Sequence, residues 1–556
     1  MEYNILIGGE AGQGMDTIGN LLEKTLKRCG FYVFTYKDYM SRIRGGHNFN
    51  QVRFSDKPLY THSPDLDIIF ALNEETINLH NSRLKQDGII ICDNDIAKVK
   101  EVMHLPLVET SKKVQDMRVY TTAGLGAILK IFGLPLDIAE GVIRDEFSGK
   151  IAETNIQAVR AGYEMIGVRH KLETREDKNI IINGNQAVAM GAIAAGCKFY
   201  CGYPMTPSSG VLTFMASKSD EMGIMVQQVE DEVAALNMAL GASYAGVRAM
   251  TGSSGGGFAL MVEALSLAGM IETPVVVIDV QRPAPATGFP TRTEQADLRF
   301  LIHAGHGEFP RMVIALRDPE DAFYQTARAF NIAEKYQIPV LLMSDEYLSD
   351  YTVTIKPYDF GKVKIERYIS GPEAVEGEEY KRFKITESGV SPRILPGKVE
   401  GQVVLVDSDE HDEWGHITES AEMRVAMVDK RMRKLEGLRQ EIEEPWFIGK
   451  ENPENLIVCW GSTYGAVREA VERLNGEGVS IGALVYGDIW PLPTKRLMEL
   501  YPKVQKLIDI EQNATGQLDS LIKEKALIRC SHKILKYDGR AFSGVEIYNR
   551  LKEEVL

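Results

Sequence analysis

The sequence predicts an α/β protein made of three βα-rich domains and a connecting arm. Two observations lead to this fold class: short apolar runs of strand length recur along the chain, and glycine-containing turns and stretches of helical length separate them. The chain has 556 residues, 44% hydrophobic and 25% charged, which is longer than one hydrophobic core normally covers. We therefore expect several α/β domains.

The first predicted domain spans residues 1–170. A strand at its start leads into a glycine-rich turn, residues 8–14, and then into a helix from Met15 to about Cys29; a second strand covers residues 31–35. The spacing of the turn's glycines differs from that of a dinucleotide-binding motif, because they are Gly9, Gly12 and Gly14. The turn is thus either a plain turn or a contact to a phosphate or coenzyme A.

The second predicted domain spans residues 179–350 and follows a charged, unpatterned linker, residues 171–178. It starts with the strand 179–182 and ends with the strand 339–343, and short apolar strands alternate with helices between them. This alternation predicts a doubly wound parallel sheet.

A polar stretch with several prolines and glycines, residues 351–453, predicts a connecting arm with a few strands. Its carboxylates and histidines at 409–418 could form a metal site, but they lack a helical spacing or a closed set of four ligands, so a solvated loop is the simpler interpretation. The basic run from Lys430 to Lys434 predicts a solvated face of a helix. Renewed strand and helix alternation over 454–556 predicts the third domain.

Chemically useful side chains follow three successive strands of the second domain. Thr206 follows a strand in a proline-bounded turn, Glu230 lies between a strand and a helix, and Arg282 follows the strand 275–280. Because open parallel sheets bind ligands at the carboxyl ends of their strands, we expect a site there for a carboxylate substrate and a nitrogen-ring cofactor.

Each of these residues also has a structural explanation. Thr206 could cap a helix, Glu230 could be a favourable charge at a helix N-terminus, and Arg282 could form a salt bridge between domains. The run 251–257, which follows another strand, resembles a phosphate loop but lacks the Gly-Lys-Ser/Thr ending of one.

The composition excludes several classes of protein. A net charge of −15 argues against general nucleic-acid binding. The apolar runs are far shorter than a membrane span, and the N-terminus has no signal-peptide pattern. The six cysteines lack metal or redox spacing, which fits a reducing cytoplasm and provides no ligand set for an iron–sulfur cluster.

Several motifs together resemble the 2-oxoacid:ferredoxin oxidoreductases, which are thiamine diphosphate enzymes. The first domain resembles their gamma domain, the second their pyrimidine-binding domain and the third their transketolase C-terminal-like domain. The arrangement looks like the fused alpha subunit of the two-subunit members, and most like that of 2-oxoglutarate:ferredoxin oxidoreductase. The motifs that carry the resemblance are Gly12-Gln13-Gly14, residues 44–48 and 51–56, Tyr203–Pro207, Gln228-Val229-Glu230 and Glu511–Leu518.

The resemblance implies roles for individual residues. Glu230 would bind N1′ of the aminopyrimidine and activate the cofactor, and Tyr203, Pro204, Thr251 and Gly252 would contact it. Thr206 would hold the 2-oxoacid, although Met205 stands where the family motif has isoleucine, and Arg282 would bind the substrate carboxylate. Arg44 is our candidate for the second carboxylate of a dicarboxylic substrate.

The resemblance also implies partners. The chain lacks the Gly-Asp-Gly and downstream Asn motif that binds Mg²⁺ in thiamine enzymes, so a beta subunit would hold the diphosphate, Mg²⁺ and a [4Fe-4S] cluster, in an (alpha–beta)₂ assembly. The expected reaction is the reversible, CoA-dependent oxidative decarboxylation of 2-oxoglutarate to succinyl-CoA and CO₂ with reduction of ferredoxin. Alternatives are pyruvate or branched-chain 2-oxoacids as substrates, a stand-alone thiamine lyase or transketolase-like enzyme, and a non-catalytic CoA- or nucleotide-binding scaffold.

Overall fold

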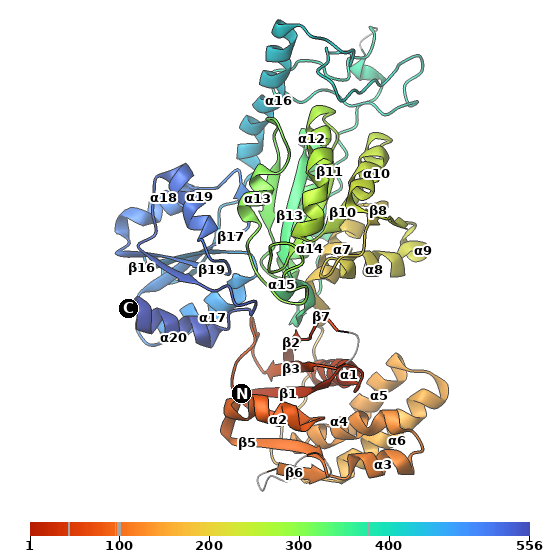
Figure 1. The fold of residues 1–556 in the computed structure, drawn as a ribbon, viewed down its shortest axis with the longest axis vertical. Helices are drawn as coiled ribbons and strands as arrows, with labels where there is room; N and C mark the ends of the chain where they lie inside the picture. Colours follow the sequence, from red (N-terminus) through yellow and green to blue (C-terminus); the bar gives the residue numbers. More distant parts are fainter. Residues whose placement is uncertain (43–44, 95, 97–101, 376–377) are drawn as a thin grey trace. The chain divides into compact units, whose positions relative to one another are not determined.

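The computed structural model describes residues 1–42, 45–94, 96, 102–375 and 378–556. The fold is α/β with three sheets, which confirms the expected fold class (Figure 1). The chain forms two compact units. The first unit contains residues 1–183, 350–358 and 543–546, and the second contains the rest. Among the described residues, no helix is both long and apolar enough to cross a lipid bilayer.

The first unit has an eight-stranded mixed sheet in the order β6-β5-β4-β1-β3-β2-β14-β7. Its strands are β1 (Glu2–Glu10), β2 (Tyr32–Asp38), β3 (His47–Ser55), β4 (Leu66–Ala71), β5 (Leu84–Asp93), β6 (Val102–Leu105), β7 (Ile180–Asn183) and β14 (Thr352–Ile355). Its helices are α1 (Met15–Arg28), α2 (Glu74–His80), α3 (Leu107–Lys113), α4 (Tyr120–Ile131), α5 (Leu136–Glu146) and α6 (Gly149–Glu164), with single 3₁₀ turns η1 (Asn81–Arg83) and η2 (Met117–Val119). The expected helix after the glycine-rich turn is therefore present as α1.

Strand β7 lies in a different sheet from the one that the sequence predicts. We expected residues 179–182 to open the second domain, but β7 pairs antiparallel with β14, and β14 pairs antiparallel with β2. The partners of β7 therefore come from distant parts of the chain. A local apolar run identifies a strand but carries no information about such remote partners.

The second unit contains a seven-stranded sheet in the order β18-β12-β13-β11-β10-β8-β9. All neighbours are parallel except β18, which pairs antiparallel with β12. The strands are β8 (Phe199–Gly202), β9 (Met225–Gln228), β10 (Ala249–Ser253), β11 (Val275–Gln281), β12 (Met312–Ala315), β13 (Pro339–Asp345) and β18 (Asp488–Trp490). The connecting helices are α7 (Gly184–Ala194), α8 (Ser209–Ser217), α9 (Ser219–Met222), α10 (Glu232–Tyr244), α11 (Gly255–Phe258), η3 (Ala259–Met261), α12 (Val262–Met270), α13 (Leu298–His303), α14 (Pro319–Tyr336) and α15 (Glu346–Asp350). The doubly wound sheet is thus confirmed.

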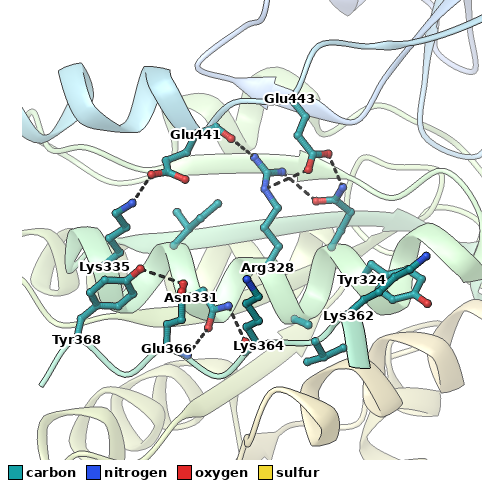
Figure 2. A pocket seen from close by; sticks show the side chains of 14 residues that line it. Tyr324, Arg328, Asn331, Lys335, Lys362, Lys364, Glu366, Tyr368, Glu441 and Glu443 are labelled. Atoms are coloured by element: carbon teal, nitrogen blue, oxygen red, sulfur yellow. Dashed lines mark hydrogen bonds and ion pairs between the residues drawn. The ribbon is translucent and has the colours of Figure 1, made fainter. Parts of the chain in front are cut away.

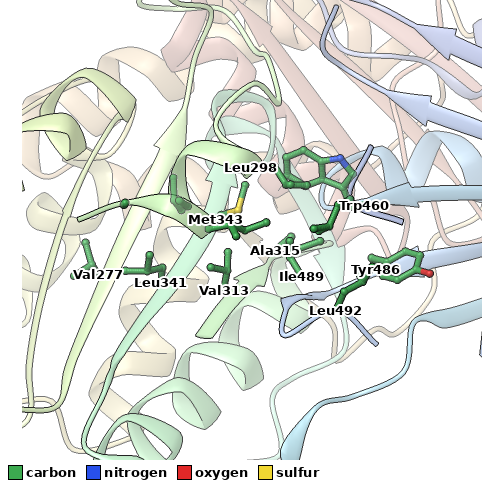
Figure 3. Close-up of a cluster of buried hydrophobic side chains, with 14 of the residues drawn as sticks. Val277, Leu298, Val313, Ala315, Leu341, Met343, Trp460, Tyr486, Ile489 and Leu492 are labelled. Carbon is green, nitrogen blue, oxygen red and sulfur yellow. The ribbon is translucent and has the colours of Figure 1, made fainter. Parts of the chain in front are cut away.

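A five-stranded sheet forms the C-terminal part of the second unit, in the order β15-β17-β16-β19-β20. Its strands are β15 (Trp446–Gly449), β16 (Asn455–Trp460), β17 (Ile481–Tyr486), β19 (Lys506–Glu511) and β20 (His532–Leu535). Its helices are α17 (Thr463–Gly476), α18 (Lys495–Leu500), the 3₁₀ turn η6 (Tyr501–Lys503), α19 (Gln517–Ala526) and α20 (Gly544–Glu554). The two sheets of this unit share one hydrophobic core, in which Val313 and Leu341 belong to the same cluster as Trp460 and Tyr486 (Figure 3).

The arm between these sheets contains η4 (Phe360–Lys362), η5 (Pro372–Ala374) and the long helix α16 (Ala421–Glu441). The prediction of a solvated basic face on this helix is wrong. Lys430 and Lys434 are 0% and 1% exposed, and both ammonium groups contact the buried carboxylate of Glu272, at 2.6 and 2.5 Å. A basic run is buried here because an acidic residue far away in the sequence compensates it.

The acidic and histidine-rich run at 409–418 is only partly solvated, contrary to expectation. Glu410 forms salt bridges with Arg424 and Arg431 of α16. The imidazole of His411 is fully buried against the ring of Phe383, with 3.8 Å between ring centroids. These contacts give the run a structural role in attaching the arm to its helix.

Candidate functional site

The carboxyl ends of four parallel strands, β8, β9, β10 and β11, lie side by side in the seven-stranded sheet. Thr206, Glu230 and Arg282 follow β8, β9 and β11 within a few residues, and the Thr251–Gly252 pair lies in β10 itself. The structure therefore brings to one edge of the sheet all of the expected cofactor and substrate residues of the second domain.

Arg282 and Thr206 are in direct contact. The guanidinium Nη1 donates a hydrogen bond of 2.6 Å to the backbone carbonyl oxygen of Thr206, although the two residues are 76 positions apart. Both side chains are half-buried, and burial lowers the pKa of Arg282. No other described residue bonds to this guanidinium, so its remaining N–H donors can bind an anion.

The other expected contacts differ in accessibility. Tyr203 and Pro204 are exposed at the rim. Thr251 is fully buried, and its hydroxyl has no partner in the described part of the chain. Gly252 is also buried, and a side chain there would collide with Ile278 and the hydroxyl of Tyr200. Gly252 is thus required for packing inside the sheet.

A second carboxylate, Glu232, follows Glu230 by two residues. Glu230 is exposed, whereas Glu232 is 2% exposed and accepts a 2.9 Å hydrogen bond from the hydroxyl of Ser253. A side chain on Gly257 would collide with both of these groups. The sequence analysis missed Glu232. The sequence signal that could have identified it is Asp231. The Asp231 side chain accepts a hydrogen bond from the backbone N–H of Ala234 and so caps α10, which makes Glu232 the first residue of this helix.

Buried polar atoms without partners mark β10 and the residue that follows it. The hydroxyls of Thr251 and Ser254 are both buried and unpaired among the described residues. Such atoms normally have a hydrogen-bond partner, because leaving one unpaired costs about 1–3 kcal/mol. Together with the nearby carboxylates, these hydroxyls fit a polar ligand such as an aminopyrimidine ring.

The first unit holds a cavity of about 550 Å³ beside the glycine-rich turn. Gly12 and Gly14 line it, together with Lys37 and Arg42. Gly14 has a φ of 86° and precedes α1, and nothing lies within 4 Å of a side chain placed on Gly12. The turn is therefore open at the N-terminus of a long helix, which suits an anion. The candidate Arg44 lies outside the described residues.

Another cavity, of about 420 Å³, is lined by residues of α14 and by two stretches of the arm, near residues 362–368 and 441–443 (Figure 2). Two cationic side chains that line it, Arg328 and Lys335, form ion pairs within the protein. Arg328 bonds to both oxygens of Asp488 at 2.7 and 2.8 Å, and Lys335 pairs with Glu441. These contacts attach the arm and the C-terminal part to α14.

Three family models match consecutive parts of the chain. Residues 190–430 match the thiamine diphosphate-binding domain of pyruvate flavodoxin/ferredoxin oxidoreductase. Residues 4–165 match the pyruvate ferredoxin/flavodoxin oxidoreductase domain, and residues 453–547 match the core domain II of pyruvate:ferredoxin oxidoreductase. The second unit thus includes a thiamine diphosphate-binding domain.

Known proteins similar to this chain cover its whole length. The 2-oxoacid:ferredoxin oxidoreductase subunit alpha of a Sulfolobus species is 33% identical over 99% of this chain and 96% of its own. The 2-oxoglutarate oxidoreductase subunit KorA of Mycobacterium tuberculosis is 29% identical over 98% and 90%. The solved structure of 2-oxoglutarate:ferredoxin oxidoreductase from Magnetococcus marinus, with 2-oxoglutarate, coenzyme A and succinyl-CoA bound, matches with a TM-score of 0.93, 32% identity and complete coverage of both chains.

Proposed function

Because this chain belongs to the 2-oxoacid:ferredoxin oxidoreductase family as an alpha subunit, we propose that it catalyses, with a beta subunit, the CoA-dependent oxidative decarboxylation of 2-oxoglutarate to succinyl-CoA and CO₂, coupled to reduction of ferredoxin. The similarity to a protein solved with 2-oxoglutarate, coenzyme A and succinyl-CoA bound supports this substrate over pyruvate. The observation that carries the proposal is the meeting of Arg282, Thr206 and the two carboxylates at one edge of the sheet.

The substrate carboxylate would bind the free N–H donors of Arg282, which the bond to the Thr206 carbonyl holds in place. A fork of donors suits a planar carboxylate better than a lysine does, because two parallel hydrogen bonds fix its orientation. The half-buried setting strengthens this contact, since less water competes for the guanidinium.

Thiamine diphosphate, when bound, supplies a nucleophilic carbon and an acceptor for the electrons that decarboxylation leaves behind. Its activation needs a carboxylate at the aminopyrimidine ring. We assign this role to Glu232 in preference to Glu230, because Glu232 is buried and held by Ser253, while Glu230 is exposed at the rim. Thr251 and Ser254 would supply hydroxyls to the same ring.

The remaining reactants would bind elsewhere. The cavity beside Gly12 and Gly14 is our candidate for a phosphate of coenzyme A, with Lys37 and Arg42 as the cations. Arg44 stays a candidate for the second carboxylate of 2-oxoglutarate. All six cysteines are free and buried, and burial raises the thiol pKa of Cys197, Cys201 and Cys459 to about 12. This supports the assignment of the [4Fe-4S] cluster, together with Mg²⁺, to the beta subunit of a cytoplasmic (alpha–beta)₂ enzyme.

The first experiment compares the chain purified alone with the chain co-purified with its beta subunit. The measurements are CoA-dependent reduction of a viologen dye by 2-oxoglutarate, pyruvate and 2-oxobutyrate, and the visible spectrum. We expect activity and iron–sulfur absorbance only in the complex, with the highest kcat/KM for 2-oxoglutarate. Activity of the chain alone would contradict the shared site, and a preference for pyruvate would contradict the substrate assignment.

The second experiment separates the two carboxylates. Hydrogen–deuterium exchange at C2 of bound thiamine diphosphate is followed in the Glu232→Gln and Glu230→Gln complexes. Exchange should slow by about 10²-fold or more in Glu232→Gln and stay near the parent rate in Glu230→Gln. The opposite pattern would return the catalytic role to Glu230.

A further inference from the structure

Two buried histidines of the first unit are in direct hydrogen-bond contact. His47 is the first residue of β3 and His80 is the last residue of α2, and each is 7% exposed. Their Nε2 atoms are 2.8 Å apart. One of these atoms must carry a proton and the other a lone pair, because two N–H groups or two lone pairs would repel each other at this distance.

Arg83 determines which histidine donates. Its Nη1 lies 3.1 Å from Nδ1 of His80, and a guanidinium has only donors, so Nδ1 of His80 is the acceptor. The proton of neutral His80 is therefore on Nε2, and this N–H donates to Nε2 of His47. The guanidinium is held in place, because its Nε and Nη2 donate to the carbonyl oxygen of Pro64 and to Oε1 of Gln51.

The second nitrogen of His47 completes the assignment. Because its Nε2 accepts, neutral His47 carries its proton on Nδ1, which is buried and has no partner among the described residues. We call the directed chain from Arg83 through His80 to His47 the histidine relay. A further proton on His47 Nε2 or on His80 Nδ1 would place one N–H against another. The histidine relay therefore exists only while both histidines are neutral.

Strand β3 connects the histidine relay to the cavity beside the glycine-rich turn. Successive side chains of a strand point to opposite faces of the sheet, so His47 contacts α2 while Asn48 lines the cavity. Oδ1 of Asn48 accepts a 2.9 Å hydrogen bond from the backbone N–H of Met40. Met40 and Arg42 line the same cavity, and the N–H of Arg42 donates to the Met40 carbonyl oxygen at 2.7 Å. The backbone of Arg42 is thus held through Met40 and Asn48.

The geometry points to His80 and His47 as positioning residues for the anion site in this cavity: the histidine relay fixes the first residue of β3, and the next residue, Asn48, holds Met40 and Arg42 at the cavity. This inference rests on the role proposed above for the cavity, that of a phosphate site for coenzyme A. It adds an acid-sensitive device to that site, because protonation of either histidine breaks the histidine relay.

Electrostatics agree with the hydrogen bonds. Burial lowers the pKa of His47, and burial together with the positive charge of Arg83 lowers the pKa of His80 to about 3. An exposed histidine has a pKa of about 6.5, so the histidine relay is stable at neutral pH and weakens as the pH falls below that value. The titratable groups that face it are Arg83 on η1, Asp38 on β2, Glu75 on α2 and, opposite His47 in the register of β1, Glu10.

The test uses the alpha–beta complex and three variants. His47→Gln keeps an oxygen that can accept from Nε2–H of His80, but it does not titrate. His47→Leu accepts no hydrogen bond. His170→Gln is the matched control, because it removes an exposed histidine of the same unit. Hydrogen–deuterium exchange of the β3 and α2 amides is measured between about pH 7.5 and about pH 5.5 and corrected for the intrinsic exchange rates. The KM and kcat for coenzyme A are measured at neutral pH by dye reduction.

In the parent complex and in His170→Gln, local opening of β3 and α2 should increase more than about tenfold over this pH range, because two histidines gain protons on opening. In His47→Gln the increase should be only about tenfold, since His80 alone titrates, and the KM for coenzyme A should stay within about threefold of the parent. His47→Leu should have a KM about tenfold higher, with a smaller change in kcat.

Two results would overturn the inference: a pH dependence of exchange in His47→Gln equal to that of the parent, or a parent-like KM for coenzyme A in His47→Leu. A parent complex without CoA-dependent 2-oxoacid activity would instead contradict the proposed function, and the exchange data would still decide whether the histidine relay forms. If His47→Leu does not fold, the exchange of His47→Gln decides the question.

Discussion

The buried contact between Glu272 and helix α16 leads to a sharp prediction about stability. The Glu272 carboxylate is 1% exposed and contacts the ammonium groups of Lys430 and Lys434, themselves 0% and 1% exposed. These cations lower the pKa of Glu272 below its usual range. Replacing Glu272 with Gln preserves the shape of the side chain but leaves two buried ammonium groups without a counter-charge.

Breaking a buried ion pair by removing one partner costs about 3–5 kcal/mol. We therefore expect Glu272→Gln to destabilise the attachment of α16 by that amount, which corresponds to a rise of at least about 10²-fold in local opening. The assay is hydrogen–deuterium exchange of the α16 amides, followed peptide by peptide. The control is Glu436→Gln, the same chemical change at an exposed position of the same helix, where a change within about 0.5 kcal/mol is expected.

The pH dependence has a defined sign. Burial lowers the pKa of Lys434 from 10.5 to about 7, so between these values the unfolded chain binds more protons than the folded one and stability rises with pH. Protection of α16 in the parent should therefore increase from neutral to alkaline pH. Equal exchange in Glu272→Gln and Glu436→Gln, or protection that falls over this pH range, would refute the reasoning.

Three further predictions concern the site and the shared core. Arg282→Lys should raise KM for the 2-oxoacid about tenfold with thiamine binding retained, because lysine cannot form two parallel bonds; unchanged kinetics would move the substrate site elsewhere. Trp460→Phe should lower the free energy of unfolding by about 1–3 kcal/mol, since the buried Glu511 loses the 2.8 Å bond from the indole N–H, and urea denaturation checks this. Gly257→Ala should abolish activity without changing the circular dichroism spectrum, because the new methyl group collides with Glu232; an active variant would argue against a catalytic Glu232.

The sequence predicted most strands and helices because their signals are local. Apolar runs of strand length predicted β11 and β13, and a glycine-rich turn predicted the start of α1. The predictions were wrong where the pairing of a strand or the burial of a side chain depends on a residue far away in the sequence. The sequence around residues 179–182 does not indicate that they pair with β14. The sequence around Lys430 does not indicate that its ammonium group forms a buried ion pair with Glu272.

The candidate site follows the same rule. Strand ends placed Arg282 and Thr206 at one edge, because parallel strands bring their carboxyl ends together. Glu232 was missed because it is the first residue of α10, and helix boundaries are poorly defined by the sequence pattern alone.

Strand β18 has a consequence for how the chain can be divided. It is encoded within the C-terminal part, yet it forms the outer edge of the seven-stranded sheet by pairing with β12. Without it, the backbone groups of β12 would form an open edge that other chains could extend. The parts of the chain before and after residue 453 are therefore not independent domains. If the gene were split there, we expect each fragment to aggregate unless the other is present.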